Sequence, residues 1–139
     1  MALATLGILV APFQGHAATA ENPPQAMGSC THRPGVVHSD RAWGKAWYGD
    51  WVCGNAAGTN VYVSPHLDNS LVSAKLDTNP SWFVCYVRGD WHAGGNNVWY
   101  RTQGDRIVGY PGAYAWGFVP AVNVWTSTDP WPGMPVCKE

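Results

Sequence analysis

Histidine and carboxylate side chains are the first groups in this sequence that could carry out chemistry. The histidines are His16, His32, His38, His66 and His92, and none of them stands in an H-x-H or H-E-x-x-H metal-binding pattern. The aspartates lie mostly beside Gly, Asn or Pro, where an aspartate commonly stabilises a turn through hydrogen bonds to nearby backbone. Catalysis would therefore need a histidine and a carboxylate that the fold brings together, and we expect neither an enzyme nor a cofactor or metal ion.

Four cysteines, Cys30, Cys53, Cys85 and Cys137, form the second group. Their separations of 23, 32 and 52 residues contain no C-x-x-C pair of the kind common in zinc sites. The even number favours two disulfide bonds over a cysteine nucleophile, which would need a free thiol. Three pairings are possible, and we prefer Cys53–Cys85 with Cys30–Cys137, because the second bond would join the ends of a domain whose termini usually lie close together.

Aromatic side chains are present in excess, with 9 Trp, 6 Tyr and 3 Phe in 139 residues. A single small core does not easily enclose so many rings, and Trp is seldom buried completely. Exposed indole and phenol rings bind sugars and peptides by stacking. We therefore expect a ligand-binding surface formed by Asp90, Trp91, His92, Trp99, Tyr110, Tyr114 and Trp116. Packing in the core or at a strand edge is the alternative for each aromatic, and it is the role we assign to Trp82, Phe83 and Tyr100.

The charge balance limits the partners of this protein. The chain has 8 basic and 9 acidic residues, and only 12% of its residues are charged. A phosphate backbone needs a concentrated basic surface, so a nucleic acid is not an expected partner. The 46% hydrophobic content is enough for a folded domain, and the length suits a single one.

The N-terminal residues have the pattern of an export signal. Residues 1–13 are apolar over the length of a signal-peptide core, too short for a transmembrane helix, and Ala18-Thr19-Ala20 is a small-x-small cleavage pattern. No Lys or Arg precedes the apolar run, which departs from the usual signal. We expect residues 1–20 to be removed and the protein to be secreted as a monomer without a transmembrane segment. A buried N-terminal helix is the alternative.

The remaining chain divides into three parts. Residues 21–58 show no sustained alternation, and three Trp spaced every fourth residue from Trp43 favour at most a short helical turn leading into a strand. In residues 59–126, runs of Val, Tyr, Trp and Phe alternate with Gly, Asn, Asp and Pro clusters, which predicts about five or six short strands in a small antiparallel barrel or sandwich. Residues 127–139 are rich in Pro and are expected to be extended.

Three short motifs in the middle part resemble those of the bacterial SH3 (SH3b) domain. Asn60-Val-Tyr-Val63 stands for the family's N-V-R strand, and Trp99-Tyr-Arg-Thr102 for its W-Y-x-V strand. Residues 117–124 stand for its closing G-W/Y-V-x-x-x-Y-V motif. The resemblance covers roughly residues 52–126. It implies an all-β, SH3-like antiparallel barrel, here with an irregular N-terminal extension at residues 21–58 and with disulfides.

The resemblance also bears on the ligand site. In eukaryotic SH3 domains the aromatic at the position of Trp99 lines the proline groove, so the likeness places ligand binding there. Two features depart from the family pattern: Asn123 replaces the final tyrosine of the closing motif, and residues 103–115 are longer than the usual hairpin.

Together these patterns predict a secreted, non-catalytic, SH3b-like binding module that recognises cell-wall polymer, a glycan or a short peptide through exposed aromatics. The first alternative is a secreted inhibitor or effector that contacts another protein through the loop 103–115. The second is a small hydrolase with a histidine–carboxylate site.

Overall fold

The structure, a computed structural model, describes residues 28–139, and these residues form an all-β fold. Nine strands in this part make two antiparallel sheets, with the strand orders β1-β2-β5 and β6-β7-β9-β3-β4-β8. The strands are β1 (Thr31–Asp40), β2 (Lys45–Cys53), β3 (Thr59–Tyr62), β4 (Val72–Leu76), β5 (Ser81–Phe83), β6 (Cys85–Arg88), β7 (Val98–Gln103), β8 (Arg106–Ile107) and β9 (Trp116–Pro120). Three 3-10 turns accompany them: η1 (Asn69–Leu71), η2 (Pro111–Ala113) and η3 (Ala121–Asn123). The all-β prediction is confirmed.

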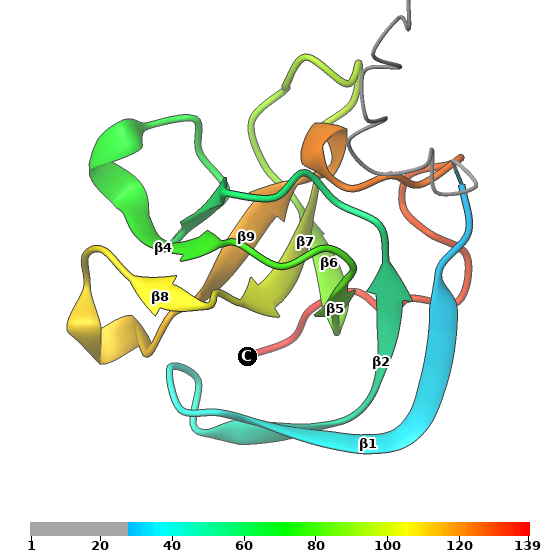
Figure 1. Cartoon of the computed structure of the whole chain (residues 1–139), viewed down its shortest axis with the longest axis horizontal. Helices are drawn as coiled ribbons and strands as arrows, with labels where there is room; N and C mark the ends of the chain where they lie inside the picture. Colours follow the sequence, from blue (N-terminus) through cyan, green and yellow to red (C-terminus); the bar gives the residue numbers. More distant parts are fainter. Residues whose placement is uncertain (1–27) are drawn as a thin grey trace, which may run out of the picture.

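The six-stranded sheet stays open. Its edge strands are β6 and β8, and no pairing between these two closes the described sheet into a barrel. Figure 1 shows the long β1–β2 hairpin arching below this sheet, with the C-terminal end of the chain drawn between the two. Within residues 28–139, no helix has the length and apolar character needed to cross a bilayer.

The expectation of an irregular segment before residue 59 is wrong for β1 and β2. These strands pair from Thr31 opposite Val52 to Asp40 opposite Lys45, with a register shift that accommodates Pro34 and Gly35. β1 is an edge strand, where a proline without an N–H group is tolerated. A spacing of four residues also places two side chains on one face of a strand as readily as on one face of a helix, so the Trp spacing does not distinguish the two.

The two faces of the β7–β9 pair are both buried. Alternation along β7 turns Tyr100 toward the main core, which also contains Val61, Phe83 and Val119. The opposite face carries Trp99, Arg101, Trp116 and Phe118, and all four are buried as well. The hairpin turn packs on this second face through Ala42 and Trp43, and the C-terminal segment does so through Cys137. A sheet face that would otherwise meet solvent is thus covered by the hairpin turn and the C-terminal segment.

The cysteines form two disulfide bonds, but not with the pairing we preferred. Cys30 bonds to Cys53, and Cys85 bonds to Cys137. Cys30 and Cys53 flank the paired residues Thr31 and Val52 at the open end of the hairpin, with their Cα atoms 4.4 Å apart. The C-terminal segment runs beside β6, where the Cys137 N–H donates to the Tyr86 carbonyl over 2.8 Å, and this brings Cys137 to Cys85. Each disulfide therefore joins two segments that lie side by side, and the first and last cysteines of the chain are not bonded to each other.

Gly117 marks the closest approach between β9 and β3. A Cβ atom at this position would lie 2.3 Å from the Tyr62 carbonyl oxygen, which is backbone and cannot rotate away. We expect Gly117→Ala to lower the free energy of unfolding by about 1–3 kcal/mol through overpacking. Gly112→Ala is the control, because nothing lies within 4 Å of its Cβ position. Urea denaturation of both variants measures the effect, and equal midpoints would contradict it.

Candidate functional site

Two neighbouring pockets lie between the hairpin turn and the β7–β9 face. The first has a volume of about 300 Å³ and lies between Trp43, Arg101, Trp116 and the turn η2. The second has a volume of about 360 Å³ and extends along Phe118 toward the C-terminal segment. Trp43 and Val63 line both pockets, so we treat the two as one groove and call it the Trp43 groove.

A buried ion pair forms the floor of the groove. The Arg101 Nε donates to Asp40 Oδ2 over 2.8 Å, and both side chains are buried. The guanidinium lies 3.5 Å from the centre of the Trp43 ring. Asp40 also accepts hydrogen bonds from the Trp43 backbone N–H and from the Trp47 indole N–H. Burial lowers the pKa of Arg101, an effect that its hydrogen bond to Asp40 opposes. Asp40 thus holds the hairpin turn against the sheet.

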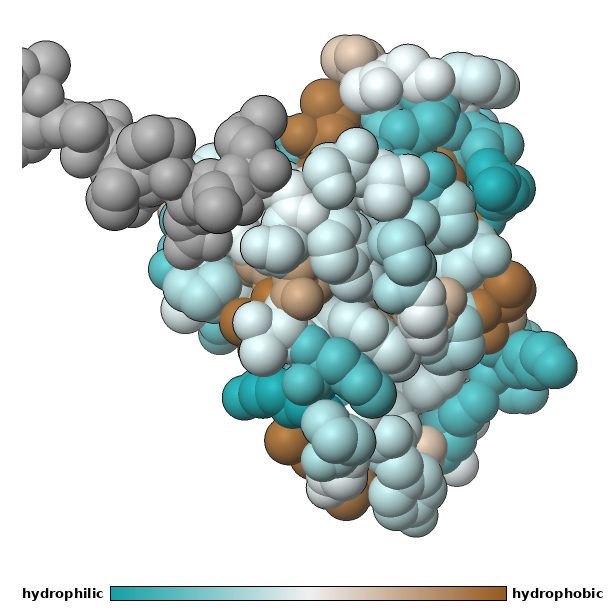
Figure 2. Space-filling view, turned by 90° about the vertical axis from the view of Figure 1, so that its right-hand side faces the viewer, coloured by the Kyte–Doolittle hydropathy of each residue, from teal (hydrophilic) through white to brown (hydrophobic). Residues whose placement is uncertain are grey.

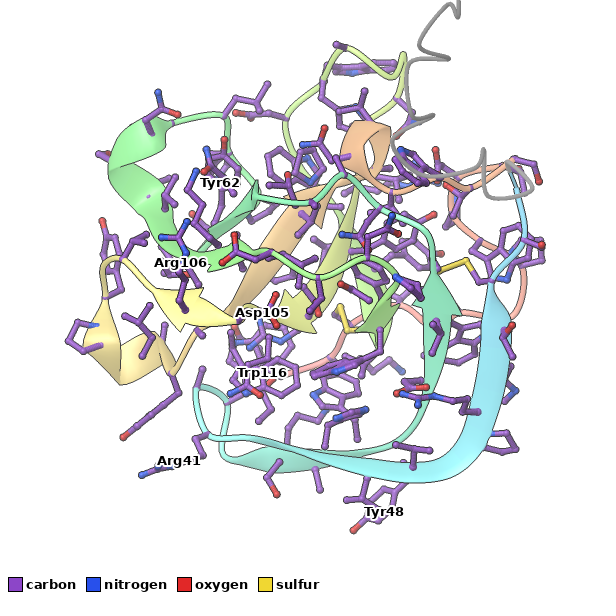
Figure 3. The ribbon with its side chains drawn as sticks, in the orientation of Figure 1. Arg41, Tyr48, Tyr62, Asp105, Arg106 and Trp116 are labelled. Atoms are coloured by element: carbon purple, nitrogen blue, oxygen red, sulfur yellow. A yellow bond between two sulfur atoms is a disulfide. The ribbon has the colours of Figure 1, made fainter. Side chains whose placement is uncertain are left out.

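Two buried nitrogen atoms at this floor lack a hydrogen-bond partner. They are Arg101 Nη2 and Trp116 Nε1, which find no acceptor among residues 28–139. A buried donor without an acceptor costs about 1–3 kcal/mol. Figure 3 shows Trp116 between the six-stranded sheet and the hairpin, on the side where the hairpin turn carries Arg41. The groove floor therefore contains two buried donors that no acceptor of residues 28–139 satisfies.

Two of the predicted stacking residues are buried instead of exposed. Trp99 is 0% exposed, and its indole N–H donates to the Asp90 carbonyl over 3.0 Å. Trp116 is 1% exposed and packs edge-to-face on Trp82. Both rings point from the second face of the β7–β9 pair, which other segments cover. The expectation that these two rings are exposed is wrong, although Trp116 still lines the first pocket.

The other predicted residues fall at two places. Tyr110 is 46% exposed and lines the first pocket, and the Tyr114 ring lies 4.0 Å below the Arg41 guanidinium. Asp90, Trp91 and His92 lie in the loop after β6 and do not line the groove, although the Asp90 N–H donates to the carbonyl of Pro65, which does. Trp91 is 68% exposed, whereas His92 is buried and hydrogen-bonds the Val98 carbonyl. The structure therefore brings Tyr110 and Trp116 together and leaves Trp91 apart.

Sequence reasoning missed Trp43 and Arg101, which line the groove, and Asp40, which pairs with Arg101. Arg101 carried a signal, because a charged residue in the middle of a strand of aromatic and β-branched residues needs a buried partner. Asp40 and Trp43 carried none, since they lie 61 and 58 positions away from Arg101 in the chain. Only the fold of the hairpin over the sheet brings these residues together.

Apolar surface is not concentrated on the face shown in Figure 2. Hydrophobic residues form separate small patches there, divided by neutral and hydrophilic surface. On the hairpin, Tyr48 is 79% exposed and points away from the rest of the fold (Figure 3). Tyr48 therefore serves below as a control residue outside the groove.

A histidine–carboxylate cluster does form, on the hairpin. The buried Asp50 carboxylate accepts hydrogen bonds from Nε and Nη2 of Arg33 and lies 2.7 Å from His38 Nε2. The His38 ring stacks on Trp82, with ring centroids 3.7 Å apart. Arg33 and Asp50 are direct partners across β1 and β2, so the cluster links the two strands. In the described part of the chain, no three His, Cys, Asp or Glu side chains lie close enough together to hold a metal ion.

This cluster predicts a loss of stability in acid. Burial of Asp50 acts to raise its pKa, but the hydrogen bonds and charges of Arg33 and His38 outweigh burial and lower the pKa. The ionised Asp50 therefore contributes to the free energy of unfolding above the ordinary Asp pKa of about 3.9. This contribution disappears as the pH falls through the lower pKa of the folded state. We expect Asp50→Asn to weaken this loss between about pH 4 and pH 2. Urea denaturation across this range measures it, and parallel pH profiles would contradict the assignment.

Comparisons with known proteins do not assign this chain to a family. No protein family matches the sequence. Searches among curated proteins and among solved structures also find no similar protein.

Proposed function

We propose that this protein is a secreted, non-catalytic, SH3b-like binding module that recognises cell-wall polymer through the Trp43 groove. The observation that carries the proposal is the groove itself. Trp43, Tyr110 and Phe118 supply aromatic surface, and Arg88 and Arg101 supply cationic groups. Aromatic side chains with a few placed polar groups are typical of sites that bind sugars and short peptides.

Two further observations support secretion and an SH3b-like arrangement of the strands. Two disulfide bonds fit an extracellular protein, in agreement with the export pattern of residues 1–20, which lie outside the described residues. The three segments that resemble SH3b motifs fall on β3, β7 and β9, and these strands are neighbours in the sheet order β7-β9-β3. The binding surface would then lie where β7 and β9 meet the hairpin.

Retention on purified cell wall tests the proposal. We expect Trp43→Ala and Tyr110→Ala to reduce retention several-fold, because each removes an aromatic wall of the groove. Tyr48→Ala should be retained like the unaltered protein, since Tyr48 lies on the hairpin outside the groove. Circular dichroism and thermal unfolding check that the variants are folded. Equal retention of all variants, or no retention of the unaltered protein, would refute the proposal.

The non-catalytic part of the proposal has its own test. The purified protein is incubated with peptidoglycan, and released fragments are analysed by mass spectrometry. We expect no fragments above those of a buffer control. Release that is lost in His38→Ala would instead assign the hairpin cluster to catalysis.

A protein–protein role through residues 103–115 is the second candidate. Ile107, Val108 and Tyr110 are large exposed side chains in this segment, and β8 lies at a sheet edge. Exposed apolar side chains at an unpaired edge favour contact with another chain. This role predicts a stoichiometric complex in culture supernatant that Ile107→Asp abolishes. A protein that elutes only as a free monomer would count against it.

A further inference from the structure

We infer that the Trp43 groove binds a short peptide through a free carboxylate, which accepts hydrogen bonds from Arg101 and Trp116. This inference rests on the proposed function and deepens it by naming the chemical group of the ligand.

The two donors match the two oxygens of a carboxylate. Arg101 Nη2 and Trp116 Nε1 are both buried and both lack an acceptor among the described residues. They come from adjacent strands, since Arg101 pairs with Phe118, two residues beyond Trp116 on the same face. The Arg101 guanidinium carbon lies 5.4 Å from the Trp116 ring centre. A carboxylate is the ligand group that offers two acceptor oxygens together and forms the stronger, charge-assisted bonds with arginine.

The charge around the groove favours an anion. Arg88 and Arg101 line it, and Arg41 and Lys45 belong to the hairpin turn and its following strand. The acidic groups there are Asp40, which is paired with Arg101, and Glu139. Acidic side chains elsewhere have other partners, as Asp50 does with Arg33 and Asp77 with Arg106. Although the net charge of the whole chain is −1, positive charge is therefore in excess around the Trp43 groove.

The walls of the second pocket favour a peptide over a sugar. Val63, Pro65, Val87 and Phe118 form part of its lining, and their side chains offer no hydrogen bonds, whereas Ser64, Arg88 and Glu139 supply its polar side chains. A sugar carries a hydroxyl on most of its carbons, and each hydroxyl left without a partner on burial is costly. A peptide can place apolar side chains against such walls and direct its carboxylate into the first pocket.

Trp43 covers the Arg101 guanidinium and must move for the carboxylate to reach it. Its ring lies 3.5 Å from the Arg101 guanidinium, and it belongs to the turn between β1 and β2. Gly44, the next residue, has a φ of 63°, a left-handed conformation that glycine adopts without strain. Ligand binding should therefore change the environments of both Trp43 and Trp116, whose indole N–H resonances report on them separately.

The test is an NMR titration of the ¹⁵N-labelled full chain. The probe is N-acetyl-Ala-Ala with a free carboxylate, and the control is the same dipeptide with a C-terminal amide. The Trp116 indole resonance is assigned from its absence in Trp116→Phe. We expect saturable shifts of the Trp43 and Trp116 indole resonances with the acid and not with the amide. Equal shifts with both probes, or none with either, would overturn the inference.

Three variants and one sugar separate the parts of the inference. Trp116→Phe keeps an aromatic side chain but removes the indole N–H donor, so it should weaken binding of the acid about tenfold. Glu139→Gln should strengthen binding about twofold, since it removes a like charge from the groove. Arg106→Gln should leave binding unchanged, because Arg106 lines neither pocket and pairs with Asp77. Glucuronic acid that binds more tightly than the dipeptide would overturn the peptide part and assign the carboxylate to a sugar.

Failure of this inference is distinguishable from failure of the proposed function. Wall retention that depends on Trp43, without binding of the acidic probe, overturns the carboxylate site alone. Binding of the acidic probe without wall retention supports the carboxylate site and overturns cell-wall polymer as the ligand.

Discussion

Asp40→Ala is expected to lower the free energy of unfolding by about 3–5 kcal/mol, because it leaves the buried Arg101 guanidinium without its carboxylate. Asp40 accepts from Arg101 Nε over 2.8 Å and also from the Trp43 N–H and the Trp47 indole, so the hairpin turn loses its attachment as well. Urea denaturation followed by circular dichroism measures the loss.

An exposed ion pair of the same chemistry is the control for this prediction. Arg106 Nε lies 2.7 Å from Asp77 Oδ2, and both side chains are about half exposed. Asp77→Ala should therefore cost at most about 1 kcal/mol. The double variant Asp40→Ala/Arg101→Met should recover part of the loss, because an apolar side chain needs no counter-charge. Equal losses in Asp40→Ala and Asp77→Ala would contradict the role we assign to burial.

Removing the Cys85–Cys137 disulfide should cost about 4 kcal/mol, as the chain-entropy relation gives for a loop of 52 residues. The bond holds the C-terminal segment against the second face of the β7–β9 pair, where Cys137 contacts the buried clusters around Trp116 and Phe118. The variant Cys85→Ser/Cys137→Ser should therefore also lose the second pocket. Denaturation measures the stability, and titration with the acidic dipeptide measures the binding.

The other disulfide provides the matched control. Cys30→Ser/Cys53→Ser opens a loop of 23 residues and should cost about 3 kcal/mol. Cys30 and Cys53 do not line the groove, so this variant should bind the acidic dipeptide like the unaltered protein wherever it is folded. Loss of binding in this variant but not in Cys85→Ser/Cys137→Ser would contradict the assignment of the binding site to the Trp43 groove.

The burial of Trp99 and Trp116 shows why the predicted aromatic surface and the observed groove differ. Alternation along β7 and β9 correctly separates their side chains into two faces, and the side chains of one face join the main core. The same alternation leaves open whether the other face meets solvent or another segment. Here the hairpin turn and the C-terminal segment cover that face, so its rings become the inside of a groove.

The sequence alone determined the all-β class, the existence of disulfide bonds and the packing roles of Phe83 and Tyr100. Strand alternation is a pattern of neighbouring residues, and an even number of cysteines can be counted without knowledge of the fold. The tertiary structure alone decided which cysteines pair, that residues 31–53 form a hairpin, and that Asp40 meets Arg101. Each of these depends on contacts between segments far apart in the chain. The energy of such contacts comes from burial that no single segment achieves by itself.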